Sequence, residues 1–220
     1  MKKNFFVSII LLITLTGCSS GEEKVITNKA STEGIEEIYI NFNSTDVTIL
    51  PSTTGDLETH LTVYDDGSDV EIDNSLKQLS ISLDSNTARL FNLTKMPKLE
   101  IKIPDYYEDL IVLNGSSGNV FGKNLGKNKI RVNTSSGNIK LEFAKINNDV
   151  DLSTTSGNAS IVLDEKEPDL HLLITTNSGR QSINLLLNEV YRNNKGLEGT
   201  LGNASNKIEI NTSSGNINLN

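Results

Sequence analysis

The chain has 220 residues with a formal net charge of -8; only 5% of the residues are aromatic, and none is Trp. This length is enough for one domain with a real core, which must here be built from Ile, Leu and Val. Without the first seventeen residues the balance is 18 basic against 28 acidic residues. This excess of acidic residues argues against binding to nucleic acid and against electrostatic attraction to anionic lipid, because no basic stripe is present to neutralise phosphates.

The first eighteen residues are typical of an export signal. Lys2 and Lys3 precede an apolar run at residues 5–15, and residues 15–18 read Leu-Thr-Gly-Cys. A membrane-spanning helix needs about twenty apolar residues, so we interpret residues 1–17 as a cleaved signal peptide. The tetrapeptide resembles the lipobox of bacterial lipoproteins, which implies that Cys18 becomes the N-terminus and carries acyl chains such as palmitate. An ordinary signal-peptidase site is the alternative.

Lipidation at Cys18 predicts a protein anchored on the extracytoplasmic face of the cell membrane, since two or more acyl chains anchor stably where one does not. Cys18 is the only cysteine, so no intramolecular disulfide can form. The next sixteen residues, Ser19 to Gly34, are mostly Ser, Thr, Gly, Glu and Lys. We therefore expect residues 18–34 to be the lipidated Cys with a flexible tether, and residues 35–220 to be one folded domain.

From Ile35 onward the pattern predicts strands, and no segment keeps a helical period with caps. Apolar and polar residues alternate at 38–40, 61–63, 79–83 and 99–103, and Pro104 ends the last of these runs. The fold class indicated is all-β.

A repeat dominates the second half of the chain. The heptapeptide Asn-Thr-Ser-Ser-Gly-Asn-Ile occurs at residues 133–139 and again at 211–217, with looser copies at 113–120, 153–159 and 175–181. The spacings of the motif glycines are 19, 20, 22 and 36 residues, and the glycines are Gly118, Gly137, Gly157, Gly179 and Gly215. Self-similarity at about twenty residues predicts a single-domain parallel β-solenoid, or β-helix, in which each coil is buried only against its neighbours.

Alignment of the coils on the motif Gly tests this prediction, since a solenoid requires inward positions to form columns. Positions seven and five residues before the Gly are apolar in every coil, and positions two and four after it are apolar except at Gln181 and Gly122. The position between the first two columns is mostly polar, as the outward face of a strand requires. Each coil is thus strand, tight turn, strand.

The same register reveals a degenerate first coil. With Thr45 at the Gly position, four apolar residues occupy the four columns: Ile38, Ile40, Val47 and Ile49. Residues 57–104 alternate without a motif Gly, which indicates a longer, less regular sheet closing the N-terminal end of the stack.

Backbone geometry explains the corner residues, because Gly accepts a positive φ without a steric penalty and Asn is the next most tolerant residue. Neighbouring Ser and Thr can hydrogen-bond the corner amides. An amide ladder along the stack is expected from Asn119, Asn138, Asn158 and Asn216. The alternative is that this polar stripe binds sugar or a lattice-like ligand.

Coils ending in Thr-Ser-Ser-Gly-Asn, preceded by a degenerate coil and by a strand ending in Ile103-Pro104, resemble the bacterial putative-adhesin domain family of unknown function. The resemblance covers about residues 35–220. It implies a right-handed parallel β-solenoid with a surface role, and it supplies no catalytic residues. This sequence departs from the pattern at Arg180, where the motif has Asn.

Known catalytic motifs are absent from the sequence. His60 and His171 are far apart and no Cys remains after lipidation, so neither a metal site nor a cofactor is expected. Residues 65–69 have the composition of a calcium loop without its ligand spacing, and a hairpin turn is the better interpretation. Residues 165–169 are interpreted as a solvated corner. Arg131 beside Asp151 could belong to a carbohydrate-cleaving solenoid, but an exposed ladder contact is the simpler explanation.

Two irregularities indicate where function lies. The last coil carries about sixteen extra residues, placed at 188–206, and such insertions in solenoids are often binding loops. Tyr191 and Arg192 in this insertion are residue types that anchor interfaces, so we expect a partner loop here, with a passive loop or covering strand as the alternative. The final strand, 217–219, has no cap after it. Its edge is therefore expected either to be covered by the insertion or to support self-association.

Together these features predict a non-catalytic, surface-exposed bacterial lipoprotein that acts in adhesion, as a scaffold or in an envelope-stress response. Its expected partners are the membrane, through the lipid anchor, and an envelope protein or glycan. The alternative function is a glycan-binding or polysaccharide-cleaving β-solenoid of the cell envelope.

Overall fold

The structure is a computed structural model that describes residues 23–64, 69–83 and 96–220. All secondary-structure elements in these ranges are β-strands. Within the same ranges no helix is long and apolar enough to cross a membrane. Cys18 and residues 65–68 of the acidic stretch lie outside the described residues.

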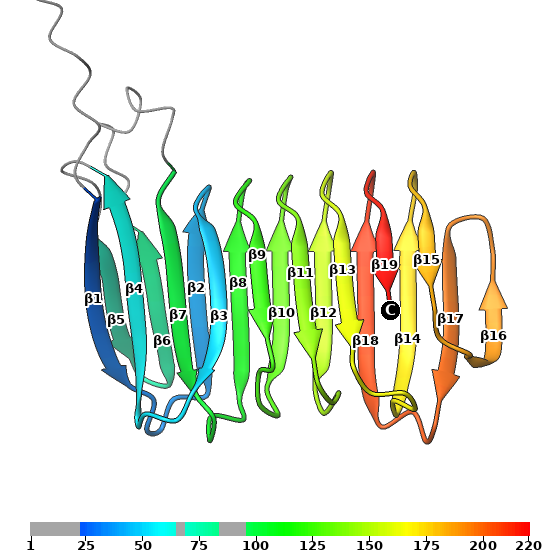
Figure 1. Cartoon of the computed structure of the whole chain (residues 1–220), viewed down its shortest axis with the longest axis horizontal. Helices are drawn as coiled ribbons and strands as arrows, with labels where there is room; N and C mark the ends of the chain where they lie inside the picture. The colour runs from blue at the N-terminus through cyan, green and yellow to red at the C-terminus, as the bar shows by residue number, and fades with distance from the viewer. Residues whose placement is uncertain (1–22, 65–68, 84–95) are drawn as a thin grey trace, which may run out of the picture.

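The strands form two sheets that run the length of a rod (Figure 1). The nine-stranded sheet has the spatial order β1 (Glu23–Ser31), β4 (Asp56–Tyr64), β7 (Lys98–Pro104), β3 (Asp46–Ser52), β9 (Val120–Lys123), β11 (Ile139–Phe143), β13 (Ala159–Leu163), β19 (Ile217–Leu219), β15 (Gln181–Ile183). The ten-stranded sheet has the order β16 (Asn188–Arg192), β17 (Gly196–Leu201), β14 (Leu170–Thr176), β18 (Asn206–Thr212), β12 (Asp149–Thr154), β10 (Lys129–Thr134), β8 (Leu110–Gly115), β2 (Glu37–Asn43), β6 (Gln78–Leu83), β5 (Val70–Ser75).

The predicted columns are confirmed by the strand register. Neighbouring coils pair in parallel so that residues at the same distance from the motif Gly lie side by side. The column seven residues before the Gly runs, in spatial order, through Ile38, Ile111, Ile130, Val150, Ile208 and Leu172. All six side chains are at most 2% exposed, so the core is a stack of aliphatic layers between the two sheets.

The degenerate coil is also confirmed, because β2 and β3 pair in parallel with β8 and β9 in the expected register. The less regular region closes this end of the rod as predicted. β6 and β7 add parallel strands to the two sheets, and β5 and β4 then pair antiparallel to them.

One predicted boundary is wrong. Residues 23–31 are not part of a flexible tether, because they form β1, which pairs antiparallel with β4 along its whole length. This strand has few apolar residues, but its backbone hydrogen bonds to β4 order it and its Ile26 and Ala30 pack against the core. The described fold therefore begins before Ile35.

The final strand is not an edge strand, which corrects the expectation of an uncapped C-terminal coil. β18 lies between β12 and β14, and β19 lies between β13 and β15. The last coil in the sequence is therefore inserted one place before the end of the stack (Figure 1). The chain runs to the end of the rod with β14 and β15, forms the antiparallel hairpin β16–β17, and returns.

Candidate functional site

The motif corners are packed so closely that only Gly fits. A Cβ on Gly157 would lie 1.9 Å from the carbonyl oxygen of Gly137. A Cβ on any of the other motif glycines would lie 1.8–2.0 Å from a carbonyl oxygen of the preceding corner in the stack. None of them has a positive φ, so the predicted reason for Gly is wrong. Close stacking of one corner on the next is the actual cause.

Four of the five motif corners have a buried Thr on the inside, three residues before the motif Gly: Thr134, Thr154, Thr176 and Thr212. The Thr154 hydroxyl accepts a hydrogen bond from the amide of Gly157 at 3.1 Å and donates to the carbonyl of Gly137 at 3.4 Å. Thr176 and Thr212 donate to the stacked glycine carbonyls in the same way. The expectation that Thr satisfies corner amides is thus confirmed at Thr154.

On the outside, the Asn side chains form the predicted ladder. The Asn138 side-chain amide donates to Asn119 Oδ1 at 3.0 Å, and Asn158 donates to Asn138 Oδ1 at 2.9 Å. Each Oδ1 also accepts the backbone N–H of the next coil, and the Asn216 Oδ1 accepts the N–H of Arg180 at 3.0 Å. Asp46 starts the ladder, where only an acceptor is needed.

This ladder uses the hydrogen-bonding groups that a ligand would need. Since Asn119, Asn138 and Asn158 each give the side-chain carbonyl oxygen and one side-chain N–H to their neighbours, the polar stripe is explained by structure. We infer that the corner residues stabilise the fold. They are Gly118, Asn119, Gly137, Asn138, Gly157, Asn158, Gly179, Gly215 and Asn216.

The opposite row of corners has an Asn column that sequence reasoning missed. Asn128 and Asn148 are at most 2% exposed, and the side chain of Asn148 donates to the carbonyls of Gly126 and Asn128. Asn206 donates to the carbonyl of Asp169 at 2.8 Å. All three Asn lie nine residues before a motif Gly, so the same column alignment could have found them.

Several ionised side chains on the outward faces lie in pairs. Arg131 Nε lies 3.3 Å from Asp151 Oδ2, and both side chains are exposed, so the predicted ladder contact is confirmed. The Lys140 ammonium lowers the pKa of the Glu142 carboxyl, and Lys207 lowers that of Glu209. A glycosidase needs a carboxyl with a raised pKa as its general acid, and these shifts have the opposite direction.

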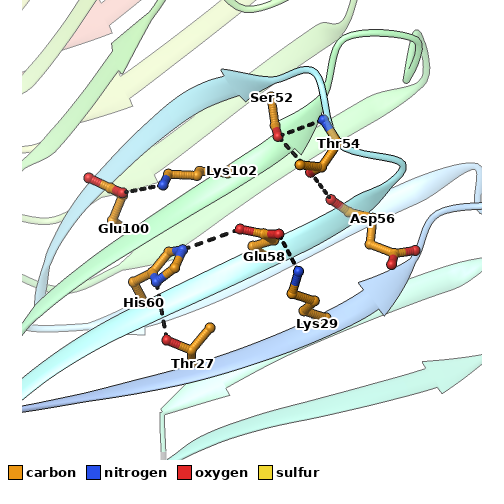
Figure 2. Close-up of polar contacts among 9 residues, drawn as sticks. All are labelled: Thr27, Lys29, Ser52, Thr54, Asp56, Glu58, His60, Glu100 and Lys102. Carbon is orange, nitrogen blue, oxygen red and sulfur yellow. Dashed lines mark hydrogen bonds and ion pairs between the residues drawn. The ribbon is translucent and has the colours of Figure 1, made fainter.

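Another group of titratable side chains lies on the outward face of β1, β4 and β7 (Figure 2). His60 Nδ1 lies 3.2 Å from the Thr27 hydroxyl, and His60 Nε2 lies 3.5 Å from a Glu58 carboxylate oxygen. Lys29 contacts the other Glu58 oxygen at 2.6 Å and lowers the pKa of this carboxyl. Glu58 is therefore held ionised by a cation, which suits a cross-strand contact.

The remaining candidates from the sequence are structural. His171 lies on the outward face, as expected, with its Nε2 2.9 Å from Glu198. Asp169, in the expected solvated corner, accepts the backbone N–H of Ser205 at 2.9 Å and its hydroxyl at 2.8 Å. These bonds lower the pKa of Asp169 and fix the turn before β18. Among the described residues, no three His, Cys, Asp or Glu side chains gather closely enough to hold a metal ion.

The insertion at 188–206 is a hairpin rather than a loop, and it forms the end of the rod farthest from β1 (Figure 1). Leu185 and Leu187 pack against the core and cover its end. Every residue of β16 is exposed, and Tyr191 is 65% and Val190 50% exposed. We define the tip surface as Arg180, Leu186, Val190, Tyr191, Arg192 and Lys195, all of them exposed.

Comparison with known proteins agrees with this architecture. The family described as Toastrack DUF4097 matches residues 123–220. No curated protein matches the chain significantly. Among solved structures, a putative cell adhesion protein from Clostridium sporogenes has a TM-score of 0.68 at 14% identity, over 90% of this chain and 99% of that one. A putative adhesin from Bacteroides fragilis has a TM-score of 0.41 at 13% identity, over 90% and 97% of the two chains. At such identities the first likeness shows a shared fold.

Proposed function

Residues 123–220 of this chain belong to the Toastrack DUF4097 family, and on this premise we propose that the chain is a surface-exposed bacterial lipoprotein with a non-catalytic, adhesion-type binding domain. The similar fold of a putative cell adhesion protein supports the adhesion-type role. We also propose that the solenoid is right-handed, as the family resemblance implies, and that its coils have about 20 residues, as the spacing of the repeat predicts. A scaffold or envelope-stress role would use the same binding surface.

The observation that carries the proposal is where the exposed apolar side chains lie. Among the described residues, the large hydrophobic side chains that are exposed are Val25, Leu76, Met96, Tyr106, Leu186, Val190 and Tyr191. Three of the seven belong to the tip surface, and β9 to β14 in the middle of the rod carry none. Exposed apolar side chains together with a Tyr and an Arg are typical of a protein interface, so the tip surface is the proposed binding surface.

Crosslinking from the tip tests this proposal in the bacterium that makes the protein. The full chain would carry a photo-reactive residue in place of Tyr191, and in a matched control in place of Ser160, on the outward face of β13. We expect crosslinked products from position 191 and none from position 160. Identical patterns from the two positions would contradict the proposal.

Anchoring through Cys18 is a separate part of the proposal. Cys18 lies five residues before Glu23, so the chain between them reaches at most about 17 Å, which would hold the β1 end of the rod close to the bilayer. We expect the wild-type chain to incorporate labelled palmitate and to sediment with membranes. Cys18→Ala should lose both properties, and palmitate labelling that survives this substitution would refute the assignment.

A further inference from the structure

We propose that the partner of the tip surface is a second copy of this chain, which binds through the opposite end of its rod. The inference rests on the proposed function, because it takes the tip surface as the binding surface. It specifies the occupant from the charges and exposed side chains of the two ends.

The end opposite the tip has an outer strand, β5, that belongs to the same ten-stranded sheet as β16. Its Glu71 and Asp73 are exposed, and Leu76 immediately after it is 99% exposed. None of the ion pairs found among the described residues involves either carboxylate. We define the base surface as Asp69, Glu71, Asp73 and Leu76.

The tip surface has the complementary composition. It carries three cations, Arg180, Arg192 and Lys195, and none of them forms an ion pair with any residue that the structure describes. Leu186, Val190 and Tyr191 lie among these cations along the chain. The tip surface therefore offers an apolar contact beside three cations, with the exposed carboxylate of Glu189 also on β16, and the base surface offers an apolar contact beside three carboxylates.

The strand directions also match. β5 is antiparallel to β6, which runs parallel to the coil strands, whereas β16 is antiparallel to β17 and so runs parallel to β14. Two rods in line would place β16 of one copy antiparallel to β5 of the next. The ten-stranded sheet would then continue across the contact.

A bulge limits how much of this contact the backbone can supply. The register of β16 shifts between Asn188 and Tyr191, and Glu189 has a φ of 48°. Bulges of this kind oppose regular pairing of edge strands, so side chains must provide most of the contact and its specificity. Because charges contribute, the association should weaken as the salt concentration rises.

Leu76 of the base surface and the start of β1 lie on opposite sides of the stack. Glu23 pairs with Tyr64, at the end of β1 that lies on the side of the motif corners. Ser75, just before Leu76, pairs with Gln78 on the opposite side. A contact between unlike ends leaves one tip and one base free in every assembly, so it generates open chains of molecules.

Complementation between two variants of residues 19–220, which contain every described strand, tests the inference. Tyr191→Asp blocks the tip and Leu76→Asp blocks the base, and both side chains are exposed, so each variant should fold. In sedimentation the wild type should form dimers and larger species with rising concentration, and each variant alone should associate at least ~10-fold more weakly. An equal mixture should form dimers and nothing larger, because only one competent tip and one competent base remain for each pair.

Disulfide capture checks the contact directly, since residues 19–220 contain no cysteine. Val190→Cys mixed with Asp73→Cys should form a covalent dimer on mild oxidation, and Ser160→Cys mixed with Asp73→Cys should not. A wild type that stays a single chain at every concentration would overturn the inference, as would a Val190→Cys variant that dimerises efficiently by itself. If position 191 crosslinks a different envelope component in cells while these assays fail, the proposed function stands and the second copy does not.

Discussion

Replacing Gly157 by Ala tests the reason for the glycine in the motif. The new Cβ would lie 1.9 Å from the carbonyl oxygen of Gly137 and 2.8 Å from the Thr154 hydroxyl, where ordinary contacts begin near 3.4 Å. The neighbouring coils must therefore separate locally by about 1 Å or more. Such a movement breaks the bonds from Ser156 N to Ser135 O at 2.9 Å and from Asn158 N to Asn138 Oδ1 at 3.0 Å.

The expected cost follows from these contacts. Two or three lost hydrogen bonds contribute about 1 kcal/mol each, and overpacking adds about 1–3 kcal/mol. We therefore expect the free energy of unfolding to fall by about 3–5 kcal/mol, with a decrease in Tm of roughly 10 °C for a domain of this size. Urea and thermal unfolding followed by far-ultraviolet circular dichroism would measure both quantities.

Gly55 provides the matched control, because a Cβ there meets nothing within 4 Å and its φ is not positive. Gly55→Ala should stay within about 0.5 kcal/mol of the wild type. Gly157→Asn distinguishes the stacking explanation from the backbone-conformation explanation, since Asn tolerates a positive φ but its Cβ makes the same clash. A Gly157→Ala variant as stable as Gly55→Ala would refute the stacking argument.

Three further predictions concern polar side chains. Thr154→Val should lower the free energy of unfolding in urea by about 1–3 kcal/mol, because a buried corner amide loses its acceptor. Thr59→Val should be neutral or stabilising, because the buried Thr59 hydroxyl has no hydrogen-bond partner among the residues that the structure describes. Asn138→Ala should cost about 1 kcal/mol by interrupting the ladder, and Asp46→Asn, which keeps the acceptor, should cost less than half of that. Asp169 has a lowered pKa in the folded state, so its stabilisation is complete above about pH 4 and is lost as the pH falls through the folded pKa. The difference in Tm between wild type and Asp169→Asn should therefore shrink from pH 6 to pH 3, and a constant difference would contradict the assignment.

The sequence by itself determined the coil. A pleated strand sends alternate side chains to opposite faces, so four aligned columns identified the inward residues, and the register of β8, β10 and β12 agrees residue by residue. The same reasoning recovered the degenerate coil around Thr45, because its apolar spacing survives without the Gly. It also placed Tyr191 and Arg192 in an exposed insertion, where the structure has them. Each of these features depends on residues close together in the chain.

Only the tertiary structure decided how the coils are ordered and why the motif has Gly. In the last three coils of the sequence, Val150, Leu172 and Ile208 occupy equivalent positions in the same layer of the core. Because these aliphatic side chains are so similar, the local sequence pattern cannot specify which coil lies next to which. The stacking clash at Gly157 arises between coils about twenty residues apart, and β1 is ordered by pairing with β4 rather than by its own composition. The tip surface and the base surface likewise depend on which strands lie outermost. β5 and β16 become the ends of the sheet only when the whole stack is assembled.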